Sequence, residues 1–109
     1  MISRIVTCNV KGDKLNEFRN TLNQRFLPRI QQQRGFVDLV ESIDTNTGTF
    51  VCNTFWNTKQ DVEQYDSTLF QEISNALTPY LQTQPTVETL NVENSTVHNI
   101  SAGKKTAAA

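Results

Sequence analysis

The apolar and polar residues of this chain follow two patterns, one of period two and one of helical period. Apolar residues alternate with polar ones over Ile2–Val10, which predicts a β-strand. From Leu15 the apolar spacing changes to three and four residues, which predicts an amphipathic helix with Asp13 as its N-cap. Pro28 cannot donate a backbone hydrogen bond, so we expect a kink or loosened turns over Gln24–Pro28. The apolar face of this helix carries Leu15, Phe18, Leu22, Phe26 and Ile30.

The strand pattern then returns twice. Arg34–Gly35 ends the first helix, and strand-like sequence follows over Phe36–Ile43 and over Thr49–Trp56. The residues between these strands, Asp44–Gly48, are turn formers, and their Asn and Gly tolerate a positive φ. We therefore expect the two strands to form an antiparallel hairpin.

A second amphipathic helix follows the hairpin directly. Thr58 and Asp61 have the spacing of a capping box with the shorter acid, which marks the start of the helix. Asp66–Thr68 should interrupt it, because short polar side chains compete for backbone hydrogen bonds. Pro79 ends the helix, and Thr86–Val92 is the fourth predicted strand. The apolar face of this helix carries Val62, Tyr65, Leu69, Ile73 and Leu77.

The order β-α-β-β-α-β predicts an α+β, ferredoxin-like sandwich with one antiparallel sheet and two helices on one face. Residues 1–93 form this single domain, and residues 94–109 form a C-terminal tail that is too poor in apolar residues to pack alone. The other sheet face is also expected to be apolar, so a second copy packed sheet to sheet, a homodimer, should cover it. We assign to that face Val6, Cys8, Val37, Leu39, Cys52, Thr54, Leu90 and Val92.

Composition and charge limit the classes of partner that we expect the protein to bind. The 109 residues carry a formal net charge of −1 and no run of basic residues, so we expect neither a nucleic-acid nor a membrane partner. No segment has the ~20 apolar residues of a membrane span, and the first residues lack the apolar core of a signal peptide, so we expect a cytoplasmic location. Cys8 and Cys52 lie in apolar strands and are interpreted as buried free thiols, with a disulfide between them as the less favoured alternative.

The sequence lacks the motifs that several classes of enzyme reaction require. The chain has no Gly-rich phosphate loop, no Ser-His-acid order and no paired-cysteine spacing, so phosphoryl transfer, triad hydrolysis and dithiol redox chemistry have no support. The single histidine, His98, lies in the tail without carboxylate or thiolate neighbours and is interpreted as a solvent residue. We therefore expect no metal site and no cofactor.

Three segments around the hairpin carry a diffuse family motif. They are Gln31–Phe36, where a helix end runs into Gly and Phe, the strand end Thr54–Trp56, and Asn57–Val62 with Tyr65 and Phe70 after it. Over residues 1–92 the chain resembles the antibiotic biosynthesis monooxygenase (ABM) family. The resemblance implies a dimeric α+β barrel whose subunits each hold a pocket for a small aromatic or apolar molecule between sheet and helices. The family includes oxygenases of polycyclic aromatic polyketides that use neither metal nor flavin, quinol oxidases, and relatives that bind and cleave haem.

The resemblance suggests three catalytic candidates, each with a structural alternative. Asn9 corresponds to a strand-one Asn that holds a substrate oxygen or dioxygen in oxygenases and haem-cleaving relatives, or it caps the strand end. Trp56 could stack on a planar substrate or direct its indole N–H at a phenolate, although core packing is its more common role. Tyr65 lies where many members carry a His, and its hydroxyl could bond to substrate or form the wet tip of a packing residue. The predicted substrate-binding aromatics are Phe26, Phe55 and Phe70.

Three functions follow, in order of preference. The first is a cofactor-independent monooxygenase or oxidoreductase acting on a small aromatic, quinol or polyketide-like metabolite. There a deprotonated, desolvated phenolic substrate reacts with dioxygen itself, and the protein supplies orientation, a proton acceptor and a dry cavity. The second is a non-catalytic dimeric barrel that binds a small molecule or a partner protein, favoured by the absence of a clear general base. The third, a haem-binding or haem-degrading protein, lacks the helix-two His, because that turn reads Glu72–Ala76.

Overall fold

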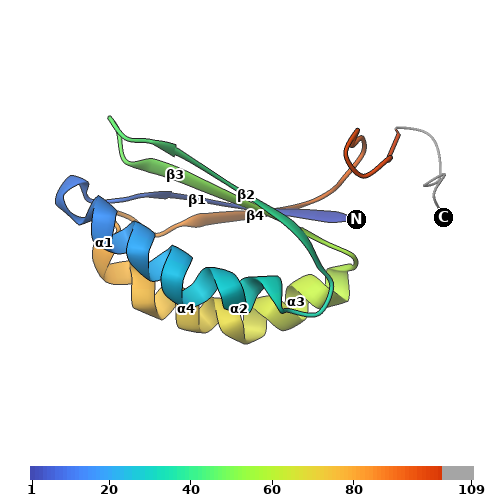
Figure 1. Ribbon diagram of the computed structural model, residues 1–109, viewed down its shortest axis with the longest axis horizontal. Helices are drawn as coiled ribbons and strands as arrows, with labels where there is room; N and C mark the ends of the chain where they lie inside the picture. The colour runs from blue at the N-terminus through green and yellow to red at the C-terminus, as the bar shows by residue number, and fades with distance from the viewer. Residues whose placement is uncertain (102–109) are drawn as a thin grey trace.

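The computed structural model describes residues 1–101, which form one antiparallel sheet covered on one face by helices (Figure 1). The sheet order is β2-β3-β1-β4, and each neighbouring pair is antiparallel. The strands are β1 Ile2–Asn9, β2 Phe36–Asp44, β3 Thr49–Trp56 and β4 Thr86–Asn91. The helices are α1 Leu15–Asn20, α2 Leu27–Gln31, α3 Lys59–Ser67 and α4 Leu69–Leu77. This arrangement confirms the predicted ferredoxin-like α+β fold.

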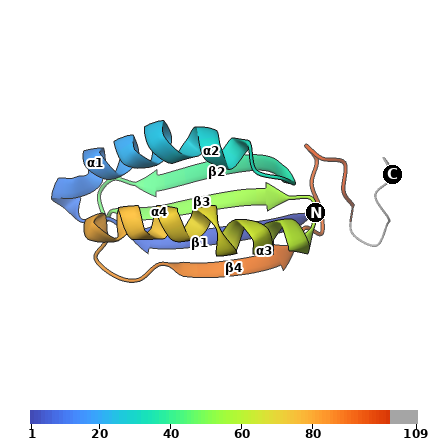
Figure 2. The ribbon, with the colours of Figure 1, turned by 90° about the horizontal axis from the view of Figure 1, so that it is seen from below.

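The helices do not cover the whole sheet. Figure 2 shows them running along β2, β3 and β1, while β4 lies uncovered at the edge. All six residues of β4 are exposed, as expected for an uncovered edge strand. The core therefore lies between the helices and the three other strands. Its most buried large apolar side chains are Trp56, Phe18, Phe26, Ile30 and Val10.

The first predicted helix is interrupted where Pro28 disturbs its hydrogen bonding. Six residues, Thr21–Phe26, form π-helical turns between α1 and α2, and Pro28 lies in the first turn of α2. The predicted loosened turns are confirmed, because a proline cannot donate to the carbonyl four residues earlier. The predicted N-cap is wrong. Asp13 lies inside a 3₁₀ turn, Gly12–Lys14, and no side chain caps α1.

The second helix begins and breaks where the sequence predicted. The Thr58 hydroxyl accepts a hydrogen bond from the Asp61 backbone N–H at 3.1 Å and donates to the Asp61 carboxylate at 2.8 Å. The break falls at Thr68, whose φ of −122° and ψ of −93° are not helical. Its hydroxyl donates to the backbone carbonyl of Gln64 at 2.6 Å, the local competition that was expected.

The predicted assignment of sheet faces is wrong for several residues. Val6, Cys8, Cys52 and Thr54 face the helices, where they line a cavity, and Leu39 packs against the core. The period-two pattern sorts each strand into two sets of residues, but it does not say which set the helices cover. The open face instead carries Ser3 and the residues that share its side of the sheet. Its apolar members are Ile5, Val40, Val51, Phe55 and Leu90.

The described part of the tail returns to one end of the open face. Ser95 and Ile100 pair as an isolated antiparallel bridge. His98 lies beside Asp38, with Nε2 3.6 Å from a carboxylate oxygen, and its ring is 6.3 Å from that of Phe55. The imidazole is therefore partly buried, and its interpretation as a solvent residue is wrong. The rest of the tail, residues 102–109, lies outside the described residues, and the domain boundary at residue 93 stays a prediction.

Candidate functional site

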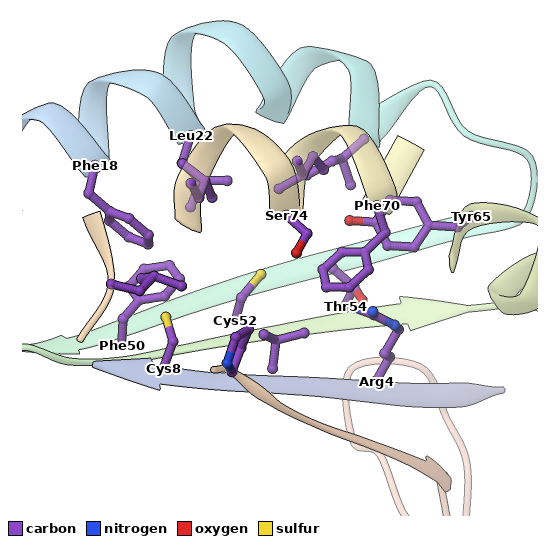
Figure 3. A pocket seen from close by; sticks show the side chains of 16 residues that line it. Arg4, Cys8, Phe18, Leu22, Phe50, Cys52, Thr54, Tyr65, Phe70 and Ser74 are labelled. Atoms are coloured by element: carbon purple, nitrogen blue, oxygen red, sulfur yellow. The ribbon is translucent and has the colours of Figure 1, made fainter. Parts of the chain in front are cut away.

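A cavity lies between the sheet and the helices. Its empty volume is about 580 Å³, part of which is open to solvent. Figure 3 shows side chains of β1 and β3 forming its floor and side chains of the helices forming its roof. The apolar residues that line it include Val6, Phe18, Leu22, Ile30, Phe50, Phe70, Ile73 and Leu77. Such a lining suits a planar apolar body.

The polar lining is sparse and includes one charge. Arg4 on β1 is only 2% exposed, although its guanidinium remains charged in ordinary conditions. Its central carbon lies 4.1 Å from the ring centroid of Phe70 and 5.2 Å from that of Tyr65. One terminal nitrogen lies 2.7 Å from a carboxylate oxygen of Asp66. Arg4 is thus held between two aromatic rings and one carboxylate at one end of the cavity.

Tyr65 reaches the cavity from α3. It is 4% exposed, and its hydroxyl end points into the cavity (Figure 3). Burial raises the pKa of Tyr65 well above its ordinary value of 10; the positive charge of Arg4 lowers it to a smaller extent, and Cys52 and Asp66 add smaller increases. The phenol is therefore neutral near neutral pH. It can donate a hydrogen bond to a ligand oxygen but does not serve as a base.

The two cysteines lie on the cavity floor as free thiols. Burial raises the pKa of Cys8 to about 11. Burial, together with the negative charge of Glu41, raises the pKa of Cys52 to about 12. Both thiols are protonated near neutral pH, so they act as small apolar groups and not as nucleophiles.

The structure brings only two of the predicted site residues to the cavity, Tyr65 and Phe70. Trp56 lies directly behind Tyr65, with ring centroids 4.8 Å apart, and its indole N–H donates to the Thr54 hydroxyl at 2.8 Å. Trp56 thereby fixes two cavity residues without lining the cavity itself. The other three predicted residues, Asn9, Phe26 and Phe55, also lie away from the cavity lining.

Those three residues occupy two different places. Phe26 is fully buried in the core, where the guanidinium of Arg25 lies 4.7 Å from its ring centroid. Asn9 and Phe55 lie on the open face, on the opposite side of the sheet from the cavity. The amide oxygen of Asn9 accepts a hydrogen bond from the Thr49 hydroxyl at 3.1 Å. This contact agrees with the structural alternative for Asn9, as a residue that fixes the strand end.

Sequence reasoning missed Arg4, Ser74 and a half-buried acid, Glu41. Arg4 lies on the same face of its strand as Val6 and Cys8, because alternate residues of a strand share a face. A charged residue in line with these apolar residues could have drawn attention to it. Glu41 likewise falls between Leu39 and Ile43 on the helix-facing side of β2. It lines a neighbouring hollow, and its Oε2 atom is buried without a hydrogen-bond partner. Burial raises the pKa of this carboxyl above its ordinary value of 4.5.

We expect Glu41→Gln to stabilise the protein more near neutral pH than in acid. The raised pKa means that the folded state holds the proton more tightly, so this contribution to stability is complete below pH 4.5 and is lost as pH rises through the folded pKa. Glutamine has no charge to bury, so its advantage should grow with pH. Urea unfolding of both proteins in acid and at neutral pH measures this. An equal difference at both pH values would contradict it.

No group of three or more His, Cys, Asp or Glu side chains within residues 1–101 could hold a metal ion. Among the same residues, no helix is long and apolar enough to cross a membrane.

The fold and cavity define a class: a ferredoxin-like α+β protein with a cavity under its helices. No protein-family model matches the chain, and no curated protein matches it in sequence. Solved structures do match. An antibiotic biosynthesis monooxygenase is 15% identical, with a TM-score of 0.73, over 84% of this chain and 98% of that one. A monooxygenase of Streptomyces coelicolor, solved in complex with nanaomycin D, is 16% identical, with a TM-score of 0.73, over 86% and 88%.

A third match carries no activity in its name. It is a conserved protein of Methanosarcina mazei, 20% identical, with a TM-score of 0.71, over 82% of this chain and 89% of that one. At these identities the likeness establishes the fold. The chain has the fold of the antibiotic biosynthesis monooxygenases, which confirms the structural part of the predicted resemblance.

Proposed function

We propose that the chain is a cofactor-independent monooxygenase that oxidises a small aromatic, quinol or polyketide-like metabolite in the cavity. The observation that carries this proposal is the cavity itself, which is mostly apolar and lined by aromatic side chains on a fold shared with proteins named as monooxygenases. A dry pocket favours reaction of a desolvated phenolate or enolate with dioxygen.

The reaction needs no external reductant when the substrate supplies all the electrons. In an anthrone-like substrate, a ring CH₂ group and dioxygen give a ring carbonyl and water, so one oxygen atom enters the product and the other leaves as water. The protein has to hold the ring, exclude water and stabilise the substrate oxyanion. We assign the hydrogen bond to that oxygen to the hydroxyl of Tyr65, because its hydroxyl end points into the cavity.

Oxygen consumption with a panel of naphthols and anthrones tests the proposal. We expect turnover above buffer by the metal-free protein and a fall of about 10-fold in Tyr65→Phe, the size of a lost hydrogen bond to a charged oxygen. Asn9→Ala is the matched variant on the open face and should keep the wild-type rate. No turnover above buffer would overturn the proposal. A loss confined to Asn9→Ala would move the chemistry to the open face.

A second candidate is a barrel that binds a small apolar molecule without reaction. One observation favours it: Tyr65, Cys8 and Cys52 all keep their protons near neutral pH, so none of these cavity groups is a base. Saturable binding of an aromatic ligand with no oxygen uptake on any panel member would select this function over oxygenation.

We also propose that two copies pair through their open sheet faces. That face carries the five apolar residues named above, and two of them, Val40 and Leu90, are about half exposed at 50% and 51%. Burying such side chains against a second copy is favourable. Light scattering after size exclusion at micromolar concentration should give the mass of a dimer, and Val40→Lys should give that of a monomer. A wild-type monomer would refute the pairing.

A further inference from the structure

We infer that the ligand of the cavity carries a single oxyanion and that the guanidinium of Arg4 binds it through Nε. The inference deepens the proposed function by naming the class of ligand, an aromatic or otherwise apolar monoanion. It depends on the same cavity but not on catalysis.

Arg4 is both charged and buried, and these two properties together indicate an anion-binding role. Among the described residues that line the cavity, Arg4 is the only charged one, and it is 2% exposed. Burying a charge is costly unless paired and hydrogen-bonded groups compensate it. This costly group lies in a wall that is mostly apolar, which is where a recognition group for an anion would lie.

The existing partner of Arg4 compensates only part of the guanidinium. Asp66 approaches one terminal nitrogen at 2.7 Å through its buried Oδ1 atom, while its side chain as a whole is 38% exposed, so this carboxylate engages only one corner of the guanidinium. Arg4 Nε is buried and has no hydrogen-bond partner. An arginine fork offers several donors to carboxylates, so one side of this fork is left for another oxygen.

The aromatic neighbours hold the fork in place. The guanidinium lies over the rings of Phe70 and Tyr65, on the same side of the cavity (Figure 3). Stacking of this kind fixes an arginine before the ligand arrives, so little side-chain freedom is lost on binding. The Tyr65 hydroxyl also points into the cavity and could provide a second donor.

The other residues that line the cavity determine what kind of group the ligand can carry beside its oxyanion. Phe18, Leu22 and Phe50 lie toward the other end of the cavity from Arg4 (Figure 3). A ligand with one oxyanion and a planar apolar body would fit both ends. With a phenolic substrate, the positive charge of Arg4 would favour the phenolate and so lower the pKa of the bound phenol. The substrate could then lose its proton although neither the cavity thiols nor Tyr65 serve as a base.

Calorimetric titration with 2-naphthoate and its neutral isostere 2-naphthamide tests the inference. We expect the wild type to bind the carboxylate about 10- to 100-fold more tightly than the amide, the range for a charge-assisted hydrogen bond. This preference should vanish in Arg4→Met. It should persist in Lys11→Met, which removes one exposed positive charge away from the cavity. An equal affinity for the two ligands in the wild type, or a preference retained in folded Arg4→Met, would overturn the inference.

A second variant decides the case if Arg4→Met does not fold. Asp66→Asn frees the guanidinium from its competing carboxylate, so the preference for naphthoate should rise several-fold. A purely structural ion pair predicts no rise, and that result would overturn the inference. Naphthoate is a binding probe and not a substrate, so binding that depends on Arg4, together with an absence of oxygen uptake, would reject only the proposed oxygenase activity.

Discussion

Replacing Trp56 with alanine should lower the free energy of unfolding by about 3–5 kcal/mol, the range for removal of a large buried aromatic side chain. Trp56 has no exposed surface and packs against the rings of Phe36 and Tyr65. Its loss would also leave the Thr54 hydroxyl without the indole N–H that now donates to it. Small domains are stable by only about 5–15 kcal/mol, so this variant should be close to unfolding at ambient temperature.

Urea denaturation at one fixed protein concentration measures the effect, because pairing of copies would make stability depend on concentration. Trp56→Phe keeps most of the packing and should show a smaller loss, chiefly that of the hydrogen bond to Thr54. Val97→Ala is the surface control, since Val97 is 77% exposed, and should change stability by less than about 0.5 kcal/mol. A small loss in Trp56→Ala would mean that the indole is not a central packing residue.

Replacing Ser74 with phenylalanine should abolish ligand binding without unfolding the protein. Ser74 lies on α4, and Figure 3 shows its hydroxyl directed into the cavity. A ring at this position would occupy the space of the ligand, so we expect affinity for naphthoate to fall by at least about 100-fold, or about 2.7 kcal/mol. Stability should hold or rise, because the substitution fills empty space with apolar atoms.

The matched control is Asn75→Phe, which adds the same ring one residue later at an exposed position on α4. It should leave naphthoate affinity unchanged. Calorimetry gives the affinities, and urea denaturation shows whether each variant is folded. Wild-type affinity in folded Ser74→Phe would show that the ligand does not bind in the cavity.

The order and boundaries of the elements could be predicted because each rests on a local signal. Thr58 and Asp61 mark a helix start through the hydrogen bonds between them. Pro28 lacks a backbone N–H and so disturbs the helical hydrogen bonds near it, whatever the rest of the fold. Asp13 was wrongly expected at the N-cap because a 3₁₀ turn precedes α1 and puts Lys14, one residue later, at the N-cap position.

The site was harder to predict because it depends on which sheet face the helices cover. Ile5 and Val51 lie on one face and Val6 and Cys52 on the other, and hydrophobicity alone does not rank the two sets. The aromatic corner at Trp56 was found, but the chain places the indole behind the cavity wall and not in it. Arg4 stood out only once the helix-facing set was known.

The most direct test of this account is a crystal structure of the protein grown with 2-naphthoate. We expect the rings of the ligand in the cavity between sheet and helices, near Phe70 and Phe50, with a carboxylate oxygen within hydrogen-bond distance of Arg4 Nε. A cavity filled by its own side chains, with naphthoate bound on the open sheet face or nowhere, would contradict the account.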